Sequence, residues 1–440
     1  MKKFISITIK KHLLLLTVML TPDGHAQTLN EAVLKALQTN PELLAAVDNL
    51  KAVEAQITQA RAGYLPIVDL NAGYGRERSD NATTRAVTDK PGHALTLNRS
   101  EANLTLTQTL FNGFATRNRV ARADAASRAA GFGMERVAES VAMNAVEAYV
   151  ETVKRREQLE LTRDNLLLHQ RVLEKIRARH EAGGGESKAD VQQTESRLAL
   201  ASANHAANQG AEQNARSLFL RVIGENPENP ARPELPTRGI PESREEAVEK
   251  AWTGHPAMLA AQAELEMAQK ELDESKAAFA PQVSLELSYG LNDDVGGSAG
   301  HGNSAAAMLR LKQNLYRGQA DLARSKELYE RLSQRRNQME QTRRAIQEAV
   351  ETAWDQWRAT RDRVTYLKQH TAISKEVTES YHTQFKMGKR TWLDVLNAEN
   401  ELFVAKTSLV GEELSDIKIF CQLLANMGLL RPFLTETGTP

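Results

Sequence analysis

The chain has 440 residues, of which 25% are charged and only 5% aromatic, and its 56 Lys and Arg residues balance its 56 Asp and Glu residues. A chain without net charge is not drawn as a whole to nucleic acid or to an anionic membrane surface. The ten histidines show no metal-ligand spacing, and no Gly-rich phosphate loop or catalytic constellation stands out. We therefore expect a protein that is not an enzyme, with no cofactor, no metal site and no nucleic-acid partner.

The N-terminus predicts a secretory signal peptide over residues 1–26. Lysines precede an apolar run at 13–20, and small residues lead up to Ala26. An N-terminal membrane anchor is the alternative, but the run is shorter than the roughly 20 residues that a membrane-spanning helix needs. The only cysteine is Cys421, so no internal disulfide can form and no cysteine at the cleavage site can carry a lipid.

The first half of the remaining chain begins with a helical pattern and then changes to a period of two. Apolar residues recur at helix-compatible spacing from about Thr28 to Gly63. Over residues 68–75 apolar residues alternate with small or polar ones, which predicts a strand with one apolar face. A polar stretch over 76–99 indicates a long loop, and a second strand follows over about 102–113.

Two long helical segments come next. An Ala-, Arg- and Glu-rich stretch predicts a helix from Gly113 to about Ala182, and a return helix is expected over 187–223. A helix of roughly 65 residues would be about 100 Å long, far longer than a globular domain needs. Prolines then recur throughout 224–242, which predicts an extended linker.

The second half repeats the first, and this duplication is the strongest organisational signal in the sequence. The matching landmarks are Asn40-Pro41 with His255-Pro256, Tyr64-Leu65-Pro66 with Phe279-Ala280-Pro281, Leu110-Phe111-Asn112-Gly113 with Leu315-Tyr316-Arg317-Gly318, and Gly224 with Gly428. We expect one repeat over 27–223 and another over 243–428, joined by the linker 224–242 and followed by a tail over 429–440. The loop of the second repeat, 292–304, is the shorter one.

The long helices of the second half carry a narrow apolar stripe typical of a coiled-coil seam. Its members are Leu332, Met339, Ile346, Val350, Trp357 and Val364, followed in the return helix by Leu393, Leu396, Phe403, Val410, Leu414, Ile417, Cys421 and Leu424. The other faces are charged or small, which predicts an elongated helical assembly in contact with water.

The four predicted strands alternate like the strands of outer-membrane barrels. Four strands cannot close a barrel, and open sheet edges cannot be satisfied in lipid, so several chains must close one together. Two copies would give eight strands around a lumen filled by side chains, and three would give twelve with room for a channel. A pore therefore favours three copies.

Two turns reverse the chain between a long helix and its return helix. Each contains a glycine, Gly184 or Gly388, that can end a helix in the left-handed conformation. Each also contains a Ser or Thr three residues before an aspartate, Asp190 or Asp394. This is the spacing of a capping box, with Asp in place of the usual Glu.

The signal peptide, the duplicated plan, the strand starts, the corner Leu110-Phe111-Asn112-Gly113 and the paired turns together resemble the TolC-like outer membrane factor family. The resemblance covers about Thr28 to Leu429. It implies an α+β membrane protein, a homotrimer in which four strands per chain build a twelve-stranded β-barrel among the lipids of the outer membrane. A long α-helical coiled-coil barrel would continue through the periplasm, with the Pro-rich linker in an equatorial belt.

The resemblance also implies a passive duct in a tripartite export system. Its periplasmic tip, at Gly184 and Gly388, would open when a periplasmic adaptor and an inner-membrane ABC or proton-driven transporter dock. The corner at 110–113 and the lack of a lipid-bearing cysteine are more similar to the type I protein-secretion branch than to the drug-efflux branch. A small-molecule efflux duct is the alternative, and a soluble periplasmic coiled-coil adaptor or scaffold is a rival that would not explain the strands.

The resemblance assigns gate roles to the second turn. Asp394 matches the aspartate of the pore constriction, where three copies would form a ring that favours cations, although it could serve only as a helix cap. Asn397 stands where a second acidic residue is frequent. Arg390 matches an arginine that ties neighbouring coils in the closed state, unless it is only a solvated charge. Phe385 replaces a tyrosine that bonds to the aspartate matching Asp190, so closure would depend more on Arg390 and on packing.

Overall fold

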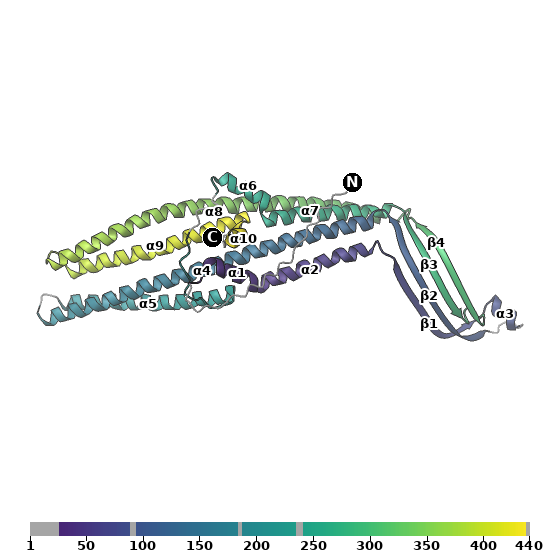
Figure 1. Ribbon diagram of the computed structural model, residues 1–440, viewed down its shortest axis with the longest axis horizontal. Coiled ribbons are helices and arrows are strands. Elements are labelled where there is room, and N and C mark those ends of the chain that lie inside the picture. The colour runs from purple at the N-terminus through teal and green to yellow at the C-terminus, as the bar shows by residue number, and fades with distance from the viewer. Residues whose placement is uncertain (1–25, 89–93, 184–186, 235–240, 437–440) are drawn as a thin grey trace.

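The computed structural model describes residues 26–88, 94–183, 187–234 and 241–436. The predicted signal peptide up to residue 25, Gly184 of the first turn, residues 235–240 of the predicted linker and the end of the predicted tail lie outside the described residues. The described chain is elongated, with long helices that continue into a four-stranded sheet at one end and finish in two hairpins at the other (Figure 1).

The same order of elements occurs twice along the chain. The first half contains α1 (Leu29–Thr39), α2 (Pro41–Ala62), β1 (Ile67–Ser79), α3 (Ala82–Thr88), β2 (Leu95–Asn112), α4 (Ala115–Glu181) and α5 (Lys188–Ile223). The second half contains α6 (Arg244–Gly254), α7 (Pro256–Ser275), the 3-10 helix η1 (Lys276–Phe279), β3 (Gln282–Asp293), β4 (His301–Lys312), α8 (Ala320–Lys386) and α9 (Trp392–Met427), and α10 (Leu430–Glu436) follows. α4 and α8 each have 67 residues, and α5 and α9 each have 36.

The single helix expected over 28–63 is wrong, because two helices occupy this stretch. The break lies at Asn40, whose side chain accepts a hydrogen bond from the N–H of Glu42 at 2.9 Å. Pro41 takes the first position of α2, where a missing N–H leaves no helical hydrogen bond unmade. The second half breaks in the same way at His255-Pro256, where the imidazole is the cap.

The long loop expected over 76–99 is also wrong, because most of this stretch is structured. β1 continues to Ser79, β2 begins at Leu95, and α3 lies between them. Polar residues extend the ladder because main-chain hydrogen bonds do not need apolar side chains. Arg99 of β2 adds an ion pair with Glu77 of β1, with 2.9 Å between nitrogen and oxygen.

The strands form one antiparallel sheet in the order β1-β2-β3-β4, so β1 and β4 are its edges. Residues paired across neighbouring strands share a face, and the two faces differ in polarity. The apolar face includes the rows Val68, Leu106, Leu287 and Ala307, and Leu70, Leu104, Tyr289 and Ala305. The opposite face includes the rows Asp69, Thr105, Ser288 and Ala306, and Asn71, Asn103, Gly290 and Ser304. The apolar face is bare in the single chain, where Leu70 is 69% exposed.

The helices lie side by side in two sets. Next to the sheet, α2, α4, α7 and α8 form a row in that order, and farther away α4 pairs with α5 and α8 with α9. α4 also packs on α9, which joins the two hairpins. The predicted apolar stripe of α8 contributes to two clusters. Leu332 packs on α7, whereas Ile346, Val350 and Trp357 are part of the main core. Within the part of the chain that the structure describes, no helix is both long and apolar enough to cross a membrane.

The main core lies midway along the long helices, where the short helices pack around them. It includes Tyr149 of α4, Phe219 of α5 and Phe420 of α9, all of them fully buried. The Tyr149 hydroxyl lies 2.6 Å from the carbonyl oxygen of Gln27 and 2.7 Å from that of Ala231. It therefore holds both the start of the described chain and the predicted linker against α4.

The two return helices end alike. Gly224 and Gly428 have φ values of +90° and +74°, in the left-handed region that glycine enters at least cost. A Cβ on Gly428 would lie 2.7 Å from the Cδ of Pro256, and a Cβ on Gly224 would lie 3.1 Å from the Oγ1 of Thr39. Each return helix thus ends against the break between the short helices of its own half.

Candidate functional site at the helical tips

The two hairpins end in the turns that the sequence singled out. In the second turn Gly388 has a φ of +74°, and its N–H donates to the carbonyl of Phe385 at 2.9 Å. The turn ends at Thr391, whose side chain caps α9. Gly184 of the first turn is not among the described residues, but Ser187 caps α5 in the same way. Both return helices therefore start from a hydroxyl cap.

Asp394 and Asp190 each complete a capping box. Oδ2 of Asp394 accepts hydrogen bonds from the N–H and hydroxyl of Thr391 at 3.0 and 2.8 Å, and Asp394 donates its own N–H to that hydroxyl at 3.3 Å. Asp190 makes the same three bonds with Ser187 at 2.8, 2.7 and 3.2 Å. These bonds stabilise the charged form and hold the pKa of both carboxyls below the usual value for Asp, with a smaller contribution from Arg390 at Asp394. Both side chains are therefore ionised at neutral pH.

Arg390 is engaged mainly with its own hairpin. Its Nε donates to Oε1 of Gln384 at 3.1 Å, and its guanidinium lies 4.1 Å from the centre of the Tyr381 ring. Nη1 is 3.9 Å from Oδ1 of Asp394. In the described chain these partners all belong to α8, α9 or the turn between them, so Arg390 shapes the turn rather than joining the two hairpins.

Phe385 joins the two hairpins through its ring rather than through a hydroxyl. Its centroid lies 4.3 Å from that of Trp392, and the guanidinium of Arg179 from α4 lies 5.1 Å from it. The ammonium of Lys175, also on α4, lies 6.0 Å from the Trp392 ring. Cations over aromatic faces are attractive, so α4 holds the start of α9 and the end of α8 by cation–π contacts.

Asn397 forms a second link between the hairpins. Its Oδ1 accepts a hydrogen bond from Nη2 of Arg197 on α5 at 2.8 Å. An acidic side chain at this position would form an ion pair with Arg197. The Asn397 amide forms a neutral hydrogen bond instead, so the tip carries less negative charge. Between these links, Val172 and Ile176 of α4 are buried against Leu396 of α9.

One layer farther from the tip, all four helices contribute charged or titratable groups. His169 of α4 is only 5% exposed, and its Nδ1 has no hydrogen-bond partner in the described structure. Burial lowers its pKa, Arg197 lowers it further, and Glu399 of α9 opposes the shift. Glu399 itself lies 2.6 Å from Nε2 of His382 on α8. The neutral imidazole is therefore part of the buried packing between the helices.

Sequence reasoning did not single out the basic and aromatic side chains that join the hairpins. Lys175 and Arg179 are four residues apart, which places them on one face of α4 beside the turn, and Trp392 directly follows the capping threonine. Those local signals were available. The pairing of Arg179 with Phe385, and of Arg197 with Asn397, depends on how the two hairpins pack, which helical periodicity alone does not fix.

No group of three or more His, Cys, Asp or Glu side chains in the described ranges is placed to hold a metal ion. The tip thus holds ion pairs, hydrogen bonds, cation–π contacts and helix caps that stabilise the two turns and join the hairpins. The chain matches the family described as "Outer membrane efflux protein" over residues 32–225 and 247–428, one segment in each half of the fold. The chain belongs to the outer membrane efflux protein family. Members of this family are outer membrane channels rather than enzymes, and the TolC-like resemblance is confirmed.

Two relatives match this chain over nearly its whole length, and a solved structure shares its fold. The outer membrane efflux protein BepC of Brucella suis biovar 1 (strain 1330) is 26% identical over 411 residues, which cover 93% of this chain and 87% of BepC. The outer membrane protein TolC of Vibrio cholerae serotype O1 is 22% identical over 415 residues, which cover 92% of this chain and 91% of that relative. The CmeC outer membrane channel of Campylobacter jejuni has the same fold, with a TM-score of 0.80 at 14% identity over 91% of this chain and 86% of CmeC.

Proposed function

We propose that three copies of this chain assemble into a passive duct that crosses the outer membrane and the periplasm. The observation that carries the proposal is the sheet, which has one apolar face and two unpaired edges, β1 and β4. Every residue of β4 is exposed in the single chain. Pairing β4 of one copy with β1 of the next would satisfy both edges, turn the apolar face to lipid and enclose the polar face around a twelve-stranded lumen.

Exposed aromatic residues at the junction of sheet and helices support this placement in a membrane. Tyr64, Phe114, Phe279 and Tyr316 are 53%, 58%, 48% and 81% exposed, and they lie next to the strand ends. Outer-membrane barrels carry girdles of aromatic residues at the membrane–water interface, where an apolar ring with a polar edge is favoured. The junction would thus lie at the periplasmic surface of the outer membrane.

The helices would continue the barrel as a tunnel. The two hairpins of one chain match in length, because each has a long helix of 67 residues and a return helix of 36. The six tips of a trimer would therefore end at one level. Such a duct has no energy source of its own. We expect its partners to be a periplasmic adaptor and an inner-membrane transporter, either an ABC transporter or a proton-driven one.

The tips would form the gate of this duct. Threefold symmetry would bring Asp394 of each copy toward the axis, where one carboxylate oxygen serves the helix cap and the other remains for cations or for Arg390. The links Arg179–Phe385 and Arg197–Asn397 would hold the closed state within each chain. Opening would require their separation, and loss of Arg390 should also raise conductance by loosening the turn.

Type I protein secretion is the first candidate cargo route, on the basis of the corner at 110–113. Small-molecule efflux is the second candidate, in keeping with the relative BepC, which is named an outer membrane efflux protein. A soluble adaptor or scaffold accounts for the hairpins but not for a sheet with a bare apolar face.

Cell fractionation followed by bilayer recording tests the duct. We expect the protein in the detergent-extracted outer membrane as a trimer that dissociates on heating, and we expect discrete conductance steps after reconstitution. A monomer found only in the soluble periplasmic fraction would refute the proposal.

Cross-linking from the tip tests the partners. Lys389→Cys adds a thiol at the tip without disturbing the left-handed Gly388. Cys421 can stay, because burial raises the pKa of its thiol to about 12 and makes it unreactive. Cross-links to an adaptor should form from residue 389 and not from a control thiol at Lys51→Cys on α2.

A further inference from the structure

A pocket of about 380 Å³ lies at the junction of the sheet and the helices, and its lining is rich in positive charge. The pocket is formed by α4, α7, α8 and the adjoining ends of β3 and β4. Its basic side chains are Arg119, Arg122, Lys312, Arg317 and Arg324, and its acidic ones are Glu271, Glu274 and Asp321. The volume is within the range of small-ligand sites, and the excess of two positive charges favours an anion.

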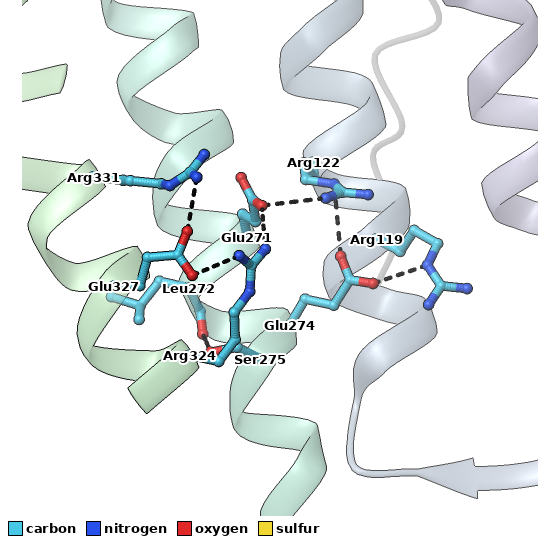
Figure 2. A network of polar contacts seen from close by, with 9 residues as sticks. All are labelled: Arg119, Arg122, Glu271, Leu272, Glu274, Ser275, Arg324, Glu327 and Arg331. Atoms are coloured by element: carbon cyan, nitrogen blue, oxygen red, sulfur yellow. Dashed lines mark hydrogen bonds and ion pairs between the residues drawn. The ribbon is translucent and has the colours of Figure 1, made fainter. Parts of the chain in front are cut away.

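The acidic residues only partly neutralise the arginines, because the four guanidiniums of Arg119, Arg122, Arg324 and Arg331 share the three carboxylates of Glu271, Glu274 and Glu327 (Figure 2). Arg324 pairs with Glu327 at 2.9 Å between Nη1 and Oε2. Glu274 lies 2.9 Å from Nε of Arg119 and 3.6 Å from Nε of Arg122. Glu271 lies 3.2 Å from Nη2 of Arg324 and 4.0 Å from Nη1 of Arg122. Each guanidinium has five N–H donors, so these contacts leave donors for a ligand.

Two further basic side chains stand at the strand end of the pocket. Arg317 has one ionic partner, Asp321, with 3.3 Å between Nη1 and Oδ1. Lys312 is exposed and makes no ion pair with any described residue. A cation that lacks a counter-ion beside a partly neutralised arginine network adds directly to the attraction for an anion.

The starts of both long helices contribute as well. α4 and α8 begin at this junction, and their N-cap residues Phe114 and Gln319 have left-handed φ values of 65° and 66° and make no side-chain capping bond. At α4 the N–H of Thr116 donates to Oδ1 of Asn112 at 3.4 Å, so the first turn is only partly capped. The positive end of each helix dipole points toward the junction. At the C-terminal end of α7, the carbonyl of Leu272 already has a hydrogen-bond donor, because the Ser275 hydroxyl donates to it at 2.7 Å.

The pocket opens on the polar side of the sheet. Gln282 and Lys312 are partners at the ends of β3 and β4, and both line the pocket. Because side chains alternate along a strand, this pair lies on the same face as the pair Ser284–Arg310 and opposite to the apolar pair Val283–Leu311. In the proposed duct the polar face surrounds the lumen, so the pocket would face passing cargo.

We infer that this junction pocket is an anion-binding site that recognises multivalent phosphate-bearing groups. Its position in the lumen rests on the proposed function, whereas its capacity to bind rests on the charges and helix starts of the single chain. In a trimer three such pockets form a positive belt between barrel and tunnel, above the acidic ring of the tips. The duct would then attract cations at its tips and retain anionic groups at its junction.

Binding of sodium tripolyphosphate to the purified detergent-solubilised protein, measured by isothermal titration calorimetry, tests the site. The double variant Lys312→Gln, Arg317→Gln should bind at least about tenfold more weakly, since it removes two positive charges that can each donate a charge-assisted hydrogen bond. Asp321→Asn should bind more tightly, because it releases Arg317. Lys51→Gln, which removes an exposed positive charge from α2, should bind like the parent.

The inference is overturned if the parent releases no heat of binding with tripolyphosphate, or if the double variant binds as tightly as the parent. Reversal potentials across a planar bilayer under a salt gradient give the second measurement. The double variant should shift toward cation selectivity and lose block by tripolyphosphate. Binding without any conductance would refute the proposed duct and support the anion site. Conductance without binding or a shift in selectivity would refute the anion site and support the duct.

Discussion

At the scale of single residues, Asp394, which we propose as a gate residue, also stabilises the start of α9. Oδ2 accepts two hydrogen bonds from Thr391, and only Oδ1 is directed to Arg390, at 3.9 Å. Removing the carboxylate should therefore weaken the start of α9, by roughly 1 kcal/mol for a lost capping contact, as well as the proposed acidic ring. The bonds that join the hairpins are separate from this cap, and they can be tested without disturbing it.

Arg197→Ala should open the tip more readily than substitutions of basic residues that stay within one helix. It removes the hydrogen bond to Asn397, the direct side-chain bond between α5 and α9. We expect a severalfold rise in mean single-channel conductance and increased uptake of bulky antibiotics. Arg171→Ala is the matched control, because among the described residues Arg171 bonds only to the Leu167 carbonyl of its own helix. Equal conductance in the two variants would show that the link does not restrain the tip.

Acidification should loosen the tip through His169. An imidazole whose pKa is lowered in the closed packing stabilises that packing above its ordinary pKa of about 6.5, and this contribution is lost as the pH falls through the lowered value. A proton on His169 would face Arg197 of α5, and the facing Glu399 is already occupied by His382. Conductance should therefore rise between pH 7 and pH 5, and His169→Gln should flatten this profile. An unaltered profile would exclude the imidazole as the sensor.

At the scale of elements, the two faces of β1 should differ in whether they tolerate a charged side chain. Leu70 belongs to the apolar face and Asn71 to the polar face. Leu70→Lys should reduce the amount of trimer in the outer membrane, since a lysine facing lipid costs up to about 2–4 kcal/mol. Asn71→Lys, one residue away, should leave it nearly unchanged. The measurement is heat-sensitive trimer on gels of outer membrane fractions, and a reversed order of the two variants would contradict the assigned faces.

The corner between β2 and α4 should be among the least tolerant positions of the chain. Gly113 has a φ of +63°, and an added Cβ would lie 2.5 Å from the Cβ of Ala280. Gly113→Ala should lower the temperature of trimer dissociation, with at least about 1 kcal/mol lost from the backbone alone. Gly133→Ala is the control: this glycine lies inside α4 with open space around it, so alanine should be neutral or stabilising. A stable Gly113→Ala trimer would show that the corner can rearrange.

The sequence predicted most elements because their signals were local and repeated. The bounds expected for the long helices are within about two residues of α4 and α5, and most of the apolar stripe is buried, with Met339, Leu393, Phe403 and Val410 half-buried. The break at Asn40-Pro41 was missed because apolar spacing continues across it, although Pro at a first helical position is itself a signal. The polar ends of β1 and β2 were missed because a strand is predicted from alternating side chains, which these ends lack. The hydrogen bonds that pair the strands come from the backbone and do not need that alternation.

At the scale of the whole molecule, the equal arms of the two hairpins imply that both must reach one plane. Inserting one heptad in each arm of α8 and α9 would lengthen that hairpin by about 10 Å while keeping its seam in phase. We expect this variant to lose closure, seen as raised conductance, and to lose export. Inserting the same heptads into α4 and α5 as well should restore closure. If the single extension is tolerated, the tips do not close against each other.

The two open edges of the sheet also have a genetic consequence. A chain whose edge strand cannot pair would still offer its other edge to a neighbour, and so it would enter mixed assemblies. With equal amounts of intact and defective chains, only about one trimer in eight would contain three intact copies. Edge-strand alleles of this gene should therefore be dominant over the wild type, whereas alleles that prevent folding altogether should be recessive.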